Sequence, residues 1–179
     1  MHIMEKKKET ELSTFRVNKE ILDKLKIESK KKKVSLNVLA NQIFESHTEF
    51  RSAAQVAGFV YVPKKWVTQI LSRYDIEESR EIARKQALEY PEAICKILRT
   101  EFSAEEHLKA LEYWMADSNI DYKKEVTGNK IKYALYHEMG MNWSWQIAEL
   151  FRTPVESLTK SEVKVDVTDS TINIEIELD

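Results

Sequence analysis

The chain has 179 residues, of which 42% are hydrophobic and 32% are charged, so it can bury a core without covalent cross-links. Its single cysteine, Cys95, excludes an internal disulfide or a site held by several cysteines, and favours a reducing, cytoplasmic location. It has no run of about 18 apolar residues, so we expect no membrane partner and no export signal.

The net charge of -2 conceals two ends of opposite sign. Residues 1–35 contain 11 basic and 6 acidic side chains, which leaves 17 basic and 24 acidic ones in the rest of the chain. A basic head of this kind attracts phosphate, whereas an acidic body is repelled by it. The alternative interpretation is a solvated, lysine-rich surface without a ligand.

Residues 12–17 alternate in the way that predicts a short β-strand. One face of this strand would carry Ser13, Phe15 and Val17. The other face would carry Thr14 and Arg16, with Leu12 in line with them. A lone strand has unpaired backbone groups on both edges, and the simplest remedy is antiparallel pairing with the same strand of a second chain.

Two capped helices are predicted after the strand. Asn18 fits the N-cap of the first helix, with Glu20 in its first turn, and Ser35 fits the N-cap of the second. Apolar residues recur at helical spacing in both, at Ile21, Leu22, Leu25, Leu36, Leu39, Ile43 and Phe44. Because about 35 residues cannot bury these faces alone, we expect a homodimer or a higher homo-oligomer.

This order of strand, cap, helix and capped helix resembles the Arc/MetJ/CopG ribbon-helix-helix family of DNA-binding proteins. The resemblance covers about a fifth of the chain, and its turn holds lysines where family members commonly carry a glycine. The residues that carry it are Ser13 to Val17, Asn18, Ile21, Leu22, Leu25, Val34 and Ser35. It implies a dimer whose paired strands enter the major groove of double-stranded DNA.

By position, the resemblance assigns base reading to Leu12, Thr14 and Arg16. Arg16 can donate two hydrogen bonds to guanine, Thr14 can bond several bases, and Leu12 offers an apolar contact. Phosphate contacts would come from the start of the second helix and from nearby lysines. These residues are Ser35, Leu36, Asn37, Lys31 and Lys32. The alternative is that all of these are ordinary solvent-facing side chains.

The middle of the chain predicts further helices. Residues 49–62 continue the second helix or form a linker, with a break at Gly58. Pro63 then fits the first position of a helix that carries Trp66 and Ile70. Longer helices are predicted over 76–98, where Pro91 marks a boundary or kink, and over 104–115, behind a Ser103 cap.

The last third predicts two β-hairpins separated by a helix. The first hairpin covers 120–137, with its turn at Thr127-Gly128-Asn129, and the second covers 163–178, with alternating valines and isoleucines. The polar partners of those apolar residues are expected to face water. The helix between them runs from Asn142 to about Leu158, and Pro154 ends or kinks it.

The sequence therefore predicts an α+β protein in two parts. Residues 1–48 would form a ribbon-helix-helix domain for DNA binding and dimerisation, followed by a linker or helix extension over 49–62. Residues 63–179 would form an α+β domain for dimerisation or sensing.

We find no matched acid, base or nucleophile, so we expect no enzyme activity, cofactor or metal site. His137 lies on the apolar face of its predicted strand and is expected to be a satisfied core histidine, with a pH or metal sensor as the alternative. Aromatic residues gather in the second half and could line a pocket for a small-molecule effector, although core packing is the competing interpretation. The candidate ligand residues are Tyr133, His137, Trp143 and Trp145.

The favoured function is sequence-specific transcriptional regulation by a DNA-binding dimer. One alternative is an antitoxin that binds DNA and neutralises a partner protein. Another is a repressor that responds to a ligand or a metal ion.

Overall fold

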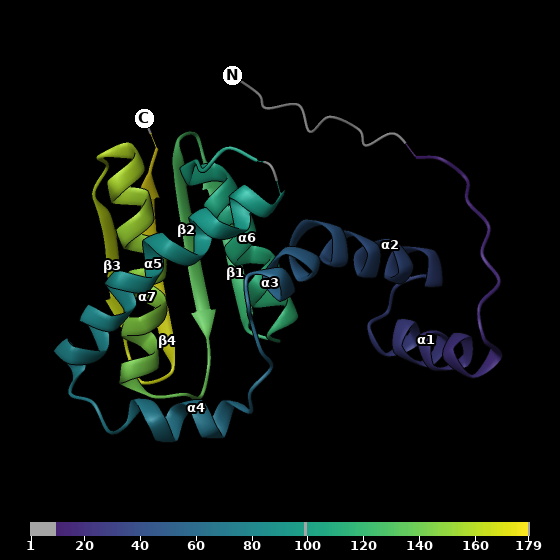
Figure 1. Ribbon diagram of the computed structural model, residues 1–179, viewed down its shortest axis with the longest axis horizontal. Helices are drawn as coiled ribbons and strands as arrows, with labels where there is room; N and C mark the ends of the chain where they lie inside the picture. Colours follow the sequence, from purple (N-terminus) through teal and green to yellow (C-terminus); the bar gives the residue numbers. More distant parts are fainter. Residues whose placement is uncertain (1–9, 99, 179) are drawn as a thin grey trace. The chain divides into compact units, whose positions relative to one another are not determined.

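The computed structural model describes residues 10–98 and 100–178, which belong to two compact units, Met1–Ile43 and Phe44–Asp179 (Figure 1). The described residues of the first unit form helices and no strand, and the second unit combines helices with an antiparallel sheet. The protein is therefore mixed α+β, as its sequence predicts. The division between the units falls inside a helix, α2.

Two capped helices make up the first unit. α1 (Lys19–Lys31) begins where Asn18 Oδ1 accepts a hydrogen bond of 2.9 Å from the Glu20 N–H. α2 (Leu36–Ser46) begins where Ser35 Oγ accepts one of 3.1 Å from the Val38 N–H. Both predicted caps are confirmed, because each side chain satisfies a backbone donor that a helix start leaves unpaired.

The predicted strand over 12–17 is not formed in the single chain. Described residues 10–18 adopt no regular element, and the first element begins at Lys19. A strand is defined by a ladder of backbone hydrogen bonds to a neighbour, and no described strand of the same chain pairs with this segment. The predicted strand is therefore absent from the described residues of this chain, and its pairing with a second chain stays a prediction.

The turn between α1 and α2 places Lys33 in the left-handed region, with φ at 55°. The Val34 N–H donates to the Ser29 carbonyl at 3.0 Å, and the Lys33 N–H donates to the Lys30 carbonyl at 3.2 Å. This pair of bonds is the Schellman motif, in which the left-handed residue is usually glycine. The lysine thus occupies a position that favours glycine.

The second unit begins with a continuation of the helical chain. A π-helical turn, η1 (His47–Arg51), leads into α3 (Ser52–Val56), and Gly58, with φ at 87°, follows its end. The predicted break at Gly58 is confirmed. The other helices of this unit are α4 (Lys64–Leu71), α5 (Ile76–Leu98), α6 (Ala104–Asp117) and α7 (Met141–Thr159).

The sheet contains the two predicted hairpins. β1 (Asp121–Thr127) pairs with β2 (Lys130–Tyr136), and β3 (Val163–Val167) pairs with β4 (Thr171–Glu177). β2 and β4 also pair with each other, antiparallel, so the hairpins form one sheet in the order β1-β2-β4-β3. The helix predicted between the hairpins is confirmed as α7.

Helices cover one face of this sheet (Figure 1). The other face carries mostly polar and charged side chains. The core joins the inward residues of β2, β3 and β4, such as Leu135 and Ile174, to Met115 of α6 and Phe151 of α7. The outer face carries charged residues, including the ion pair between Lys132 and Glu175 at 2.7 Å. The alternation predicted for the second hairpin is confirmed, since its valines and isoleucines face the core.

Prolines lie inside two helices without ending them. α5 continues past Pro91 and α7 continues past Pro154 to Thr159. Pro154 has no N–H for the Leu150 carbonyl, and His107 Nε2 donates to that carbonyl instead, at 2.8 Å. The freed acceptor is satisfied by a side chain of α6, so α7 can bury this turn in the core.

Candidate functional site

The described part of the first unit leaves most of its apolar residues in contact with solvent. Among residues 10–43, Ser29 and Leu39 are buried, and every other residue is partly or fully exposed. Leu12 is 92% exposed and Phe15 70%. The other large apolar side chains that are exposed here are Val17, Ile21, Ile27, Val38 and Ile43. So many exposed apolar side chains in so short a segment favour an interaction surface over a closed core.

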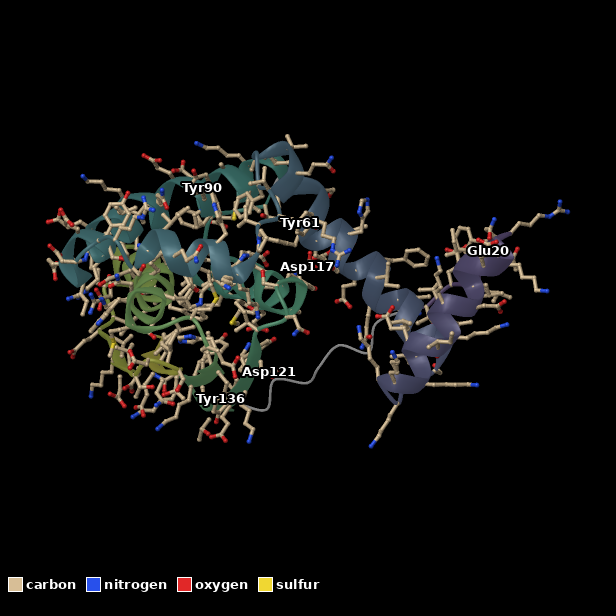
Figure 2. All side chains as sticks on the ribbon, turned by 90° about the horizontal axis from the view of Figure 1, so that it is seen from below. Glu20, Tyr61, Tyr90, Asp117, Asp121 and Tyr136 are labelled. Atoms are coloured by element: carbon tan, nitrogen blue, oxygen red, sulfur yellow. The ribbon has the colours of Figure 1, made fainter. Side chains whose placement is uncertain are left out.

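The side chains assigned to base reading lie on one exposed segment before α1. Leu12, Thr14 and Arg16 are each exposed, and they precede the Asn18 cap by six, four and two residues. Figure 2 shows side chains on all sides of α1, with Glu20 labelled in its first turn. The segment is therefore accessible to a large ligand from outside.

The residues assigned to phosphate binding gather around the turn between α1 and α2. Lys31 and Lys32 are exposed at the end of α1, and Lys32 forms a surface ion pair with Glu28 at 2.8 Å. The N–H groups of Leu36 and Asn37 come before the first backbone bond of α2, from Leu39 to the Ser35 carbonyl. Two free donors at the positive end of a helix dipole, next to lysines, suit a phosphate oxygen.

The four candidate ligand residues of the second unit do not share a cavity. Tyr133 is buried in the core, where its hydroxyl donates to Glu112 Oε1 at 2.7 Å. Burial, and then this bond, raise the pKa of the Tyr133 hydroxyl above its usual range. Its position is that of a core residue with a satisfied polar end.

His137 is a buried histidine whose two ring nitrogens both have partners. Nδ1 accepts a hydrogen bond from the Met139 N–H at 3.2 Å, and Nε2 lies 3.1 Å from Ser144 Oγ. Burial and the nearby charge of Lys64 lower the pKa of His137. It lies at the edge of a polar cleft of about 790 Å³ that Lys64 and Lys65 also line. This arrangement agrees with the interpretation of His137 as a satisfied core histidine.

The two tryptophans of α7 point to different surroundings. Trp143 lies 6.2 Å from Trp114, ring centre to ring centre, and lines an apolar cavity. Trp145 instead lies under the guanidinium of Arg80, which is 4.1 Å from the ring centre. This separation follows from their spacing of two residues on a helix, as expected.

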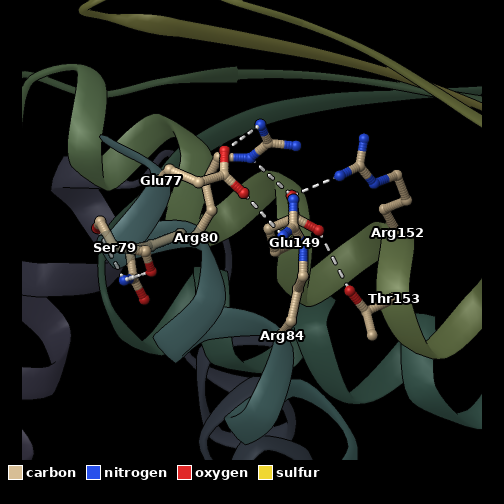
Figure 3. A network of polar contacts seen from close by, with 8 residues as sticks. Glu77, Ser79, Arg80, Arg84, Glu149, Arg152 and Thr153 are labelled. Atoms are coloured by element: carbon tan, nitrogen blue, oxygen red, sulfur yellow. Dashed lines mark hydrogen bonds and ion pairs between the residues drawn. The ribbon is translucent and has the colours of Figure 1, made fainter. Parts of the chain in front are cut away.

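A buried carboxylate surrounded by arginines was not predicted from the sequence. Glu149 of α7 is 1% exposed, and its Oε1 accepts hydrogen bonds from Arg80 (3.0 Å), Arg84 (3.3 Å) and Arg152 (Figure 3). Thr153 Oγ1 donates to its other oxygen at 3.2 Å. The bonds from Arg80 and Arg84 tie α5 to α7, so we interpret the cluster as structural. Arg80 and Arg84 lie 69 and 65 positions before Glu149 in the sequence, so no local motif predicts that they meet.

Neither a metal site nor a membrane-spanning helix is found in the described residues. Across 10–98 and 100–178, no three His, Cys, Asp or Glu side chains come together in a way that could hold a metal ion. None of the helices in these ranges has the length and apolar character needed to cross a membrane. Cys95 is buried, and burial raises the pKa of its thiol.

The chain matches no known protein family, and no curated protein is detectably similar to it in sequence.

Proposed function

We propose that the protein is a sequence-specific DNA-binding regulator of the ribbon-helix-helix type and acts as a dimer. Residues 12–17 of two chains would pair as an antiparallel ribbon and present Thr14 and Arg16 to the base edges of the major groove. Lys31 and the start of α2 would hold the flanking phosphates.

The observation that carries this proposal is the exposed apolar set of the first unit. Phe15 and Val17 would share the inner face of a paired ribbon, and the apolar residues of α1 and α2 would lie beneath it. Apolar side chains that face water raise the free energy of a monomer. A symmetric dimer would bury these side chains of both chains in one interface.

The charge of the first unit supports DNA as the ligand. Arg16, Lys31 and Lys33 are exposed in the described residues, and the unit as a whole is basic while the rest of the chain is acidic. Duplex phosphates would therefore attract the first unit and repel the second.

Selection of bound sequences from random duplex DNA, at two salt concentrations, tests the proposal. We expect enrichment of one motif and an affinity that falls steeply with salt. Arg16→Ala should weaken binding to that motif by about 1–3 kcal/mol and relax one base preference. Lys31→Ala should instead weaken binding to all sequences alike.

Lys123→Ala is the matched control, because Lys123 is an exposed lysine of the second unit and should be neutral. If the wild-type protein enriches no motif, or if Arg16→Ala and Lys31→Ala reduce specificity equally, the proposed base reading is wrong.

A pair of strand variants separates dimerisation from DNA contact. Phe15→Asp places a charge on the inner face of the ribbon and should abolish both the dimer and DNA binding. Thr14→Asp places the same charge on the outer face, so it should keep the dimer and repel DNA. If Phe15→Asp leaves the dimer intact, the paired ribbon is not the interface.

A further inference from the structure

The second unit contains an apolar cavity of about 370 Å³ that the proposed DNA contact does not use. α5, α6 and α7 each contribute to its wall, together with η1 and the chain that follows Gly58. Its volume lies within the range of small-molecule sites and is more than twice the roughly 150 Å³ of a cavity that accommodates benzene. The space therefore suits a molecule with two or three fused rings.

Aromatic side chains form much of the cavity wall. Phe59 lies edge-on to both Phe50 and Tyr90, with ring centres 6.1 and 5.7 Å apart. Trp114 and Trp143 form a second, tilted pair. Tyr90 (labelled in Figure 2) and Phe59 are also partly exposed, which places them at the opening. Rings at these positions offer flat faces and edges to a planar ligand.

Two residues of this wall carry buried nitrogens without a hydrogen-bond partner, Nδ1 of His107 and Nε1 of Trp143. His107 Nε2 carries the ring proton and donates a hydrogen bond to the Leu150 carbonyl. Nδ1 of the neutral ring is therefore an acceptor. The indole N–H of Trp143 is a donor. Buried polar groups are normally paired, and leaving one unpaired costs about 1–3 kcal/mol.

We propose that this cavity binds a planar, largely apolar small molecule that carries a hydroxyl-like group. The rings would lie between the aromatic side chains, and the hydroxyl oxygen would accept a hydrogen bond from Trp143 Nε1. The polar cleft beside His137 lacks such an apolar wall and is not the site. The proposal concerns the second unit alone and stands independently of DNA binding.

Binding of 2-naphthol to the full-length protein, followed by calorimetry or ligand-observed NMR, tests this proposal. Naphthalene serves as the comparison, since it fills the same space without a hydroxyl group. We expect both probes to bind saturably, with 2-naphthol about two- to tenfold tighter, as one added hydrogen bond would give.

Two variants locate the site. Ala110→Phe fills the cavity from α6 and should weaken both probes at least about fivefold. Ala116→Phe, on the exposed side of the same helix, should have no effect. Trp143→Phe keeps an aromatic ring but removes the N–H, so it should reduce 2-naphthol binding to the level of naphthalene and leave naphthalene unchanged.

The proposal is overturned if neither probe binds saturably to the wild-type protein. It is also overturned if Ala110→Phe, shown to be folded by its circular dichroism, binds both probes like the wild type. Arg16→Ala should bind both probes normally, so a failure of the DNA proposal is distinguishable from a failure of this one.

Discussion

The two units of the molecule differ in how far they bury their apolar side chains. The second unit encloses a core in which Tyr133, Phe151 and Ile174 are almost fully buried between helices and sheet. The first unit exposes Leu12, Phe15 and many of its other large apolar side chains. The first unit has regular, well-capped helices, so poor local structure does not explain the difference.

The difference shows that helix formation and core formation depend on different features of the chain. Caps and helical spacing are local and suffice to define α1 and α2. A core needs enough chain to close around it, which the second unit has and the first unit lacks. We propose that a second chain covers the exposed apolar residues of the first unit.

The largest effect on the second unit is expected from Glu149→Gln. The change leaves three arginines around a neutral side chain and should lower the free energy of unfolding by about 3 kcal/mol. Chemical denaturation measures this loss. Glu77→Gln is the control, because Glu77 contacts Arg80 and Arg84 but is exposed, and its loss should cost less than about 1 kcal/mol. Equal effects would contradict the structural role given to Glu149.

His107 should make the second unit sensitive to acid. Burial, only partly opposed by the bond to the Leu150 carbonyl, lowers the pKa of His107 from 6.5 to about 4. The unfolded chain therefore binds the proton more tightly than the folded one. The free energy of unfolding therefore has its full value above pH 6.5. It decreases as the pH falls, by about 3 kcal/mol at pH 4.

Unfolding measured between pH 7 and pH 4 should reveal this contribution. His107→Gln should reduce the slope of stability against pH in this window, although it lowers stability at pH 7. His47→Gln, at an exposed histidine, should retain the wild-type slope. An unchanged slope in His107→Gln would show that His107 does not carry the pH dependence.

A smaller effect is expected in the first unit at Lys33. Replacing this left-handed lysine with glycine relieves backbone strain and should stabilise the α1–α2 turn by about 1 kcal/mol. Lys32→Gly, one residue earlier and in the right-handed region, should instead destabilise the helix end. Thermal unfolding of the two variants compares them directly, and a loss of stability in Lys33→Gly would contradict the assigned turn.

Local patterns in the sequence predicted most of the helices and strands, but not which strands of different hairpins pair. The caps at Asn18, Ser35 and Ser103 and both hairpins were predictable, because each depends on residues a few positions apart. The pairing of β2 with β4 was not, since alternation defines the face of a strand and not its neighbour.

The sites depended even more on distant residues. Pro154 was expected to end or kink α7, and the sequence gives no sign that His107 would supply the missing donor. Arg80, Arg84 and Glu149 converge only through the packing of α5 on α7. Tyr133, His137, Trp143 and Trp145 were grouped because they are close in sequence, and the structure distributes them over separate surroundings.

The mass of the full-length protein in solution tests the central claim most directly. Sedimentation equilibrium at micromolar concentration should give about 42 kDa, twice the 21.0 kDa of one chain. Phe15→Asp should reduce this value to that of the monomer, whereas Thr14→Asp should leave it unchanged. A wild-type protein that stays at 21.0 kDa over this concentration range, with or without duplex DNA, would contradict the paired ribbon and the DNA reading built on it.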